Sequence, residues 1–428
     1  MKNISIILML CLSLTTQNSF SQLNSNAEKT NNSGQSFSQF RIGGYGEALF
    51  QYFDYAPYRM GGEGKGSAAD KRSEVSLPRF ILAMDYKFSP SWILSSEIEF
   101  EYGGTGAGIE AEYGEGVEYE YEFEKGGEVA LEQFHITKIF SKAISVRVGH
   151  FIVPVGITNS YHEPINFFGT SRPEGESLLI PCTWHETGLA LLGGYKNFTY
   201  QAMVINGLDP YGFSSENWIK DGRQTKFEKV QMTNPAYAAR VEYKGLKGAR
   251  FGLSGYYGPK TAKNVTNPST TKKLKGSVGI FSADAQYKGY GLTLRGNFLY
   301  GQVGDATEIN KLRPNKNTGY SNTPVAKNAM TYFVEAGYNI GKFFPEKINL
   351  VPFVRYEYHN AMQNEKTGSV ISDKRYKSDL YTVGINYFPL PNLVLKADYT
   401  HRQIDRGNFN DENTLSLAVA YIGWFFSK

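Results

Sequence analysis

This sequence is a series of short segments in which apolar and polar residues alternate. The links between these segments are short and long in turn, and this order of link lengths restricts the fold. Sixteen such segments are expected, at residues 40–53, 72–88, 91–102, 128–140, 143–151, 185–195, 197–206, 236–245, 249–257, 276–288, 290–303, 329–341, 346–359, 378–388, 391–403 and 412–426. Links after even-numbered segments are tight turns, whereas links after odd-numbered segments are mostly long. Outer-membrane barrels pair tight periplasmic turns with long external loops. The sequence therefore predicts an all-β fold, a 16-stranded antiparallel transmembrane β-barrel.

The two faces of each expected strand differ in chemistry. In 72–88, Phe80, Met84 and Phe88 share one face, and Arg79 and Asp85 share the other. A charge facing lipid costs about 2–4 kcal/mol near the bilayer midplane, so the charged face is expected to point inward. The predicted pore-lining and constriction residues are Arg79, Arg147, Arg172, Arg240, Arg295, Arg355, Lys396, Arg402, Glu97, Glu99 and Glu101. Such charges either orient hydrated solutes and bias anions against cations, or simply wet the pore.

The N-terminus has the pattern of an exported protein. Residues 1–21 contain a lysine followed by an apolar run too short to span a bilayer, which predicts a signal peptide. Residues 22–39 are rich in Asn and Ser and are expected to form a disordered lead-in to a barrel domain at 40–428. We therefore expect the outer membrane of a Gram-negative bacterium, with lipid around the barrel. The formal net charge of +4 is too small to indicate a nucleic-acid partner.

The longest interruption of the strand pattern is residues 152–184. Some thirty residues without periodicity inside a compact domain are uncommon and usually functional. We expect this segment to fold into the barrel and narrow the pore, with Arg172 and the inward basic column opposite the wall glutamates. Opposed charges across a constriction order water and favour polar solutes over apolar ones.

Two other long loops are strongly charged. Residues 110–124 hold seven Glu and no basic residue, and their alternation predicts a hairpin above the membrane. Residues 258–275 are rich in Lys. The acidic loop binds divalent cations, repels anions at the mouth of the barrel, or is simply a solvated loop. The basic loop either draws in anions or is likewise solvated.

No spacing of residues indicates catalysis or a bound cofactor. His162-Glu163 and His185-Glu186 contain metal-ligand residue types, but no H-E-x-x-H or comparable motif is present. Cys182 is the single cysteine left after signal cleavage, so no intrachain disulfide is expected. We predict that the chain is not an enzyme and carries no cofactor or metal.

A resemblance to a known family centres on the long interruption. It is carried by Val148-Gly149-His150-Phe151, Pro154-Val155-Gly156, Phe167-Phe168, Arg172-Pro173-Glu174, Pro181 and Glu186-Thr187-Gly188, together with Leu77-Pro78-Arg79-Phe80 and Glu97-Ile98-Glu99-Phe100 upstream. With these residues the chain resembles the phosphate-selective porin O and P family of outer-membrane channels, most specifically from about 72 to 208. The resemblance implies a homotrimeric 16-stranded porin with loop 152–184 in the lumen. It also implies passive diffusion of small anionic solutes.

Three functional hypotheses remain open at this point. The first is a non-enzymatic porin for small hydrophilic solutes, anions such as phosphate being expected. The second is a substrate-specific channel for oligosaccharides or dicarboxylates, in which Tyr161, Phe167, Phe168 and Trp184 form a sliding surface. The third is a surface adhesion or structural barrel that uses its long loops, 103–127 in particular.

Overall fold

The computed structural model describes residues 39–58, 62, 64–104, 107–113, 119–125, 127–224, 230–260, 275–311, 323–346, 348–364 and 366–428. The expected signal peptide at 1–21, nearly all of the lead-in at 22–39 and most of the basic loop at 258–275 lie outside these residues. Their assignments therefore stay predictions.

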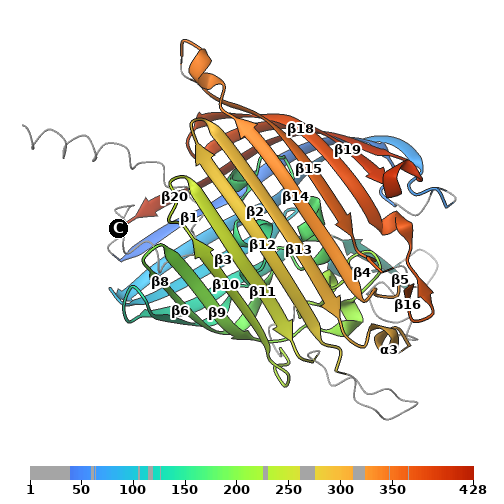
Figure 1. Ribbon diagram of the computed structural model, residues 1–428, viewed down its shortest axis with the longest axis horizontal. Coiled ribbons are helices and arrows are strands. Elements are labelled where there is room, and N and C mark those ends of the chain that lie inside the picture. Colours follow the sequence, from blue (N-terminus) through green and yellow to red (C-terminus); the bar gives the residue numbers. More distant parts are fainter. Residues whose placement is uncertain are drawn as a thin grey trace, which may run out of the picture.

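Sixteen strands close into one antiparallel barrel (Figure 1). In barrel order they are β1 (Phe40–Tyr55), β2 (Ala69–Ser89), β3 (Trp92–Glu101), β6 (Glu128–Ile139), β7 (Ser145–Ile152), β8 (His185–Tyr195), β9 (Phe198–Ile205), β10 (Ala236–Tyr243), β11 (Ala249–Gly258), β12 (Val278–Gly289), β13 (Leu292–Val303), β14 (Asn328–Tyr338), β15 (Asn349–Asn360), β18 (Lys377–Leu390), β19 (Leu393–Ile404) and β20 (Glu412–Ser427). Pairing of β1 with β20 closes the wall. The predicted fold class is confirmed, and most strand boundaries differ from expectation by three residues or fewer.

Alternation along the strands separates an apolar exterior from a polar interior. On β2 the side chains of Phe80, Met84 and Phe88 are exposed on the outer face, whereas Arg79 and Asp85 are buried inside. Exposed Phe, Tyr, Trp, Leu and Val side chains recur on the outer face of the other strands. This is the arrangement of a barrel solvated by lipid hydrocarbon.

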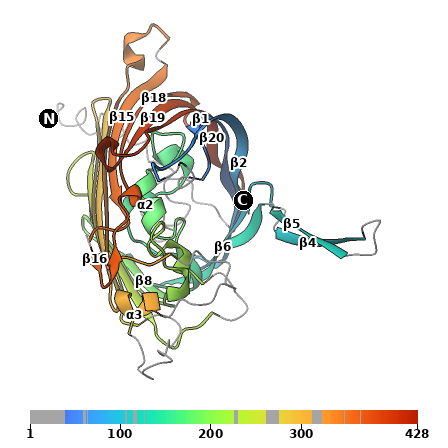
Figure 2. The same cartoon turned by 90° about the vertical axis from the view of Figure 1, so that its right-hand side faces the viewer.

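Residues 153–184, which we call the inserted segment, leave the wall after β7 and return at β8. The segment holds α1 (Ile157–Ser160), the 3₁₀ turn η1 (Pro164–Asn166) and α2 (Glu174–Leu179). Figure 2 shows α2 within the ring of strands, and α2 packs on β14 and β15 on the far side from its point of departure. Gly156 begins α1 with a φ of 79°, a conformation that glycine adopts without a Cβ penalty.

The inserted segment builds an apolar core inside the barrel together with the connection after β9. Val155, Ile180 and Trp184 from the segment pack in one cluster with Phe213 and Trp218 from that connection. The connection contains η2 (Pro210–Gly212) and η3 (Lys220–Gly222). Its inward fold was not expected from the sequence. One side of the interior is therefore filled by side chains from two loops.

The remaining elements lie in the long and short links. The hairpin of β4 (Ala107–Tyr113) and β5 (Tyr119–Lys125) falls in the acidic loop and projects away from the barrel (Figure 2), so the expected hairpin is present in the described residues. The others are α3 (Ala306–Lys311), η4 (Gly341–Phe343), β16 (Lys366–Thr367), β17 (Val370–Ile371), η5 (Lys374–Tyr376) and η6 (Asp405–Gly407). No helix in the described part of the chain is long and apolar enough to cross a bilayer.

Candidate channel constriction

The inward basic side chains hold the backbone of the inserted segment. The Lys396 ammonium on β19 donates to the carbonyl oxygens of Pro164, Phe167 and Gly169, at 2.5, 2.8 and 2.8 Å. Arginines from other strands donate to further carbonyls of the segment: Arg79 to His162, Arg240 to Gly156, Arg295 to Asn166 and Arg355 to Ser171. Because these donors come from strands around the barrel, they fix the segment to several parts of the wall at once.

The same arginines are neutralised by carboxylates of the wall. Arg240 lies 2.8 Å from Asp284 and 2.9 Å from Glu242. Further ion pairs join Arg295 to Glu335 at 2.7 Å, Arg355 to Glu357 at 2.8 Å and Arg79 to Glu47 at 3.4 Å. Another inward arginine, Arg402, pairs with Glu412 of the wall and with Glu174 of the inserted segment. A buried guanidinium requires such partners, because an unpaired charge out of water costs several kcal/mol. The expected arginine column is present inside the barrel, with most of its charge balanced locally.

The other predicted wall residues occupy different surroundings. Glu97 and Glu99 are buried on β3, and Glu101 at its outer end is half-buried. Arg147 on β7 is buried, and its Nε donates to Thr137 on the neighbouring strand. These residues lie on β3 and β7, on one part of the wall, so the predicted set does not converge on one spot.

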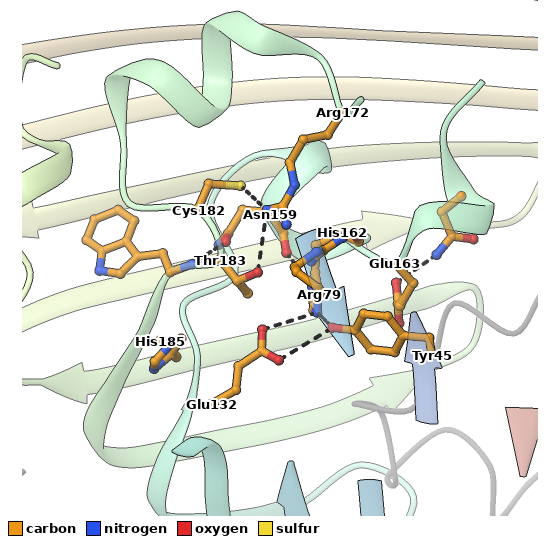
Figure 3. A network of polar contacts seen from close by, with 12 residues as sticks. Tyr45, Arg79, Glu132, Asn159, His162, Glu163, Arg172, Cys182, Thr183 and His185 are labelled. Carbon is orange, nitrogen blue, oxygen red and sulfur yellow. Dashed lines mark hydrogen bonds and ion pairs between the residues drawn. The ribbon is translucent and has the colours of Figure 1, made fainter. Parts of the chain in front are cut away.

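Three arginines in or beside the inserted segment are only half-buried. Arg172 in the inserted segment donates to Cys182 Sγ at 3.0 Å and to Thr183 Oγ1 at 3.4 Å (Figure 3). Arg223 donates to the Thr183 carbonyl at 3.0 Å. Arg250 on β11 stacks over the Tyr161 ring, with its guanidinium carbon 3.6 Å from the ring centroid. Within the described part of the chain, none of the three forms an ion pair with a carboxylate.

Sequence reasoning missed Arg250, Arg223 and one wall carboxylate, Glu132. Arg250 lies inward on β11, two residues before Gly252 and in the alternation that also buries Ser254. Its two-residue spacing could have placed it with the other inward arginines. Gln133 points inward, so alternation along β6 would place its neighbour Glu132 on the outer face. Glu132 is nevertheless fully buried.

The aromatic residues expected to form a sliding surface pack into the interior instead. Trp184 is fully buried and packs against Tyr256, with ring centroids 4.8 Å apart. Phe168 stacks on Phe353 at 5.3 Å. Tyr161 and Phe167 are also buried. These four side chains expose too little surface to make a continuous track for a sugar.

Burial controls the ionisation of the inserted segment. Burial lowers the pKa of His162 well below its usual range, and nearby Arg79 and Arg172 lower it further, so the imidazole is neutral. Burial raises the pKa of Glu176 to about 7, against the opposing effect of hydrogen bonds from the backbone of Asn159 and Thr158. Burial also raises the pKa of the Cys182 thiol, which is thereby held in its unreactive protonated form.

Comparisons with known proteins identify the fold. No family model matches this chain. A protein of Aquifex aeolicus (strain VF5), described as uncharacterized, is 28% identical over 360 residues, covering 83% of this chain and 76% of that protein. The outer membrane channel DcaP of Acinetobacter baumannii superposes with a TM-score of 0.56 at 11% identity, over 90% of this chain and 97% of that one. Salmonella typhi OmpF, in complex with daunomycin, gives 0.56 at 10% identity over the same shares. The fold is that of an outer-membrane porin.

The porin fold and the lipid-facing exterior together place the chain in the outer membrane of a Gram-negative bacterium. Of the two similar solved structures, DcaP is described as an outer membrane channel.

Proposed function

We propose that this chain is a porin for passive diffusion of small hydrophilic solutes, and that it favours anions of the phosphate type. The observation that carries the proposal is a 16-stranded porin barrel whose interior is charged and whose inserted segment is held in place by basic side chains. A polar interior within a lipid-facing wall provides a path for hydrated solutes across the membrane.

The preference for anions is supported by the arginines that remain accessible. Buried arginines such as Arg240 and Arg295 are balanced by carboxylates and contribute little net field. Arg172, Arg223 and Arg250 are half-buried and are not ion-paired among the described residues. Positive groups in a narrow, low-dielectric passage raise the local concentration of anions. Half-buried Glu101 lies in the field of Arg223, so the passage also carries a transverse field.

The test is the reversal potential of the purified protein in a planar bilayer under a KCl gradient. We expect a potential of the sign produced by chloride permeation, and reduced chloride current when phosphate is added. Arg172→Gln is expected to lower the anion-to-cation permeability ratio several-fold. Arg406→Gln is the matched control, because it removes the same charge from an exposed turn after β19.

The outcomes separate the scaffold from its selectivity. Cation selectivity with no response to phosphate would overturn the anion preference and leave a general porin. Failure of the correctly folded barrel to conduct would overturn the porin proposal itself.

We also propose that the chain assembles as a homotrimer. The β4–β5 hairpin projects away from its own barrel wall (Figure 2), where it is placed to reach a neighbouring subunit. An apolar groove of about 530 Å³ on the outer face of β1, β18, β19 and β20 offers a second surface for close packing. Mass measurement in detergent is expected to give a trimer, and deletion of residues 105–126 should shift it toward monomer. An unchanged mass for the deletion would remove the hairpin from the interface.

A further inference from the structure

Three metal-ligand side chains meet where the inserted segment touches the wall. Glu97 on β3 and Glu132 on β6 come from neighbouring strands, and His162 comes from the turn between α1 and η1. One ligand atom from each lies within 4.8 Å of the others. Glu97 is 4% exposed, and the other two are fully buried. Figure 3 shows Glu132 directed at His162, beside Tyr45 and Arg79.

A β-bulge aims Glu132 at this point. Glu97 pairs with Gln133 across the sheet, and the next residue, Ile98, pairs with Leu131, so Glu132 has no partner in the register. The extra residue turns both Glu132 and Gln133 inward. Bulges recur where a strand must redirect a side chain toward a functional site.

The hydrogen bonds of His162 leave it in the form that binds metals. Nδ1 lies 3.0 Å from the carbonyl oxygen of Asn159, which can only accept, so Nδ1 carries the proton. Nε2 therefore presents a lone pair. A ligating histidine is usually oriented by such a bond from its other ring nitrogen.

The imidazole of His162 and the carboxyl group of Glu132 face each other at this point. His162 Nε2 lies 3.5 Å from Glu132 Oε1. Glu132 Oε1 and Glu97 Oε2 are both buried and have no hydrogen-bond partner among the described residues, although the two carboxyl groups are hydrogen-bonded by Thr183 and Gln133, respectively. The Tyr45 hydroxyl is 2.9 Å from His162 Nε2 and 3.4 Å from Glu132 Oε2, and its single proton cannot satisfy every acceptor.

Acidic side chains also outnumber basic side chains around the cluster. Carboxylates of Glu99 and Glu163 add to those of the cluster, and the nearby cations are Arg79 and Arg172. Arg79 is shared with Glu47 and with the His162 carbonyl. Carboxyl groups therefore outnumber guanidinium groups around these buried side chains, an arrangement that favours an added cation.

We propose that Glu97, Glu132 and His162 bind one divalent first-row transition-metal ion, of the Zn²⁺ class, which fastens the inserted segment to the wall. One imidazole and two carboxylates form a donor set that suits such ions, whereas Ca²⁺ and Mg²⁺ prefer oxygen ligands alone. Bonds of about 2.0–2.2 Å require the ligand atoms to approach by a small rotamer adjustment. The bulge at Glu132 and the bond from His162 to Asn159 are the parts of the fold that set the geometry.

The experiment measures metal bound to the refolded, detergent-solubilised full-length protein. The protein is stripped with chelator, dialysed against Zn²⁺ alone, and its metal content is measured after removal of free ion. We expect about one Zn²⁺ per chain. Glu132→Gln and His162→Gln should each weaken binding roughly tenfold to a hundredfold or more. Co²⁺ added to the wild-type protein should give visible absorption bands of nitrogen and oxygen coordination.

Two control variants isolate the site. Glu357→Gln removes a buried carboxylate on β15, which pairs with Arg355 away from the cluster, and His185→Gln removes a buried histidine that contacts His150. Both are expected to retain full binding. Equal loss in either control, or no retained Zn²⁺ in correctly folded wild-type protein, would overturn the proposal. The Co²⁺ spectrum of the wild type decides the question even if a variant fails to fold.

Discussion

Gly156 and Glu176 are fitted together inside the barrel, so that a Cβ added to Gly156 would overlap the Glu176 carboxylate. The carboxylate accepts a hydrogen bond from the backbone N–H of Asn159 at 2.7 Å and so holds α1 beside α2. The two helical turns of the inserted segment depend on this contact.

Replacing Gly156 by Ala is expected to destabilise the folded barrel. The residue has a φ of 79°, which costs an L-residue about 1–2 kcal/mol, and the overlap with Glu176 adds to that cost. The midpoint temperature for loss of the folded band on unheated-versus-heated gels measures the effect. Gly279→Ala is the matched control, because nothing lies within 4 Å of its added Cβ and the φ there is ordinary. Equal midpoints for the two variants would contradict the prediction.

Replacing Lys396 by Met is expected to release the inserted segment from the wall. Three carbonyl oxygens lose their donor, and each buried acceptor left unpaired costs about 1–3 kcal/mol. We expect faster proteolysis within residues 153–184 and larger, noisier single-channel currents. Lys342→Met, at an exposed turn, should leave both unchanged. A Lys396→Met channel with wild-type conductance would show that this lysine does not fix the constriction.

Glu176 should make the stability of the protein depend on pH. Its folded pKa of about 7 lies above the ordinary value near 4.5, so the folded state binds a proton more tightly than the unfolded chain. The stabilisation is complete below pH 4.5 and is lost as the pH rises through 7. By pH 8 the charged form costs up to about 3 kcal/mol, since each pKa unit corresponds to about 1.36 kcal/mol.

The comparison that isolates this effect is with Glu176→Gln, which cannot ionise. Relative to wild type, we expect the variant to gain stability between pH 5 and 8 in thermal unfolding. Glu308→Gln, at a half-buried position on α3 beside Lys311, should give a curve parallel to that of wild type. If the difference in stability between wild type and Glu176→Gln did not change with pH, titration of this carboxyl group would be ruled out.

Arg250 is expected to contribute to anion preference through its place over Tyr161. Arg250→Gln removes a half-buried positive charge while leaving the ring in place, so the reversal potential should move toward the value for no selectivity. Tyr161→Phe keeps the ring but loses the hydroxyl that donates to Glu242 at 2.6 Å. We expect its selectivity to stay close to wild type. A reversal potential unaltered in Arg250→Gln would exclude this arginine from the conduction path.

The wall was predictable because a period of two residues is a local property of the chain. Phe80 and Arg79 fall on opposite faces whatever the rest of the molecule does. Glu132 escaped the same reasoning because a bulge breaks the period, and only the pairing across β3 and β6 shows where it falls. The two successive polar residues, Glu132 and Gln133, were the one local sign of this bulge in the sequence.

The interior was harder to predict because aperiodic segments are placed by distant contacts. The basic column was expected from alternation, yet the capture of segment carbonyls by Lys396 depends on residues more than 200 positions away in the sequence. The inward fold of the connection holding Trp218 depends likewise on packing against Leu299 and Val303. Neither contact produces a repeating pattern of residues that could be recognised in the sequence.

The inserted segment begins and ends at one place on the wall, where the N–H of Val153 donates to the carbonyl of Trp184 at 2.8 Å. Strands β7 and β8 pair with each other without it. In genetic terms, one contiguous stretch of coding sequence encodes the whole segment that crosses the interior of the barrel. A recombination event that exchanged this stretch would leave every strand pairing intact, so the passage can diversify faster than the wall that surrounds it.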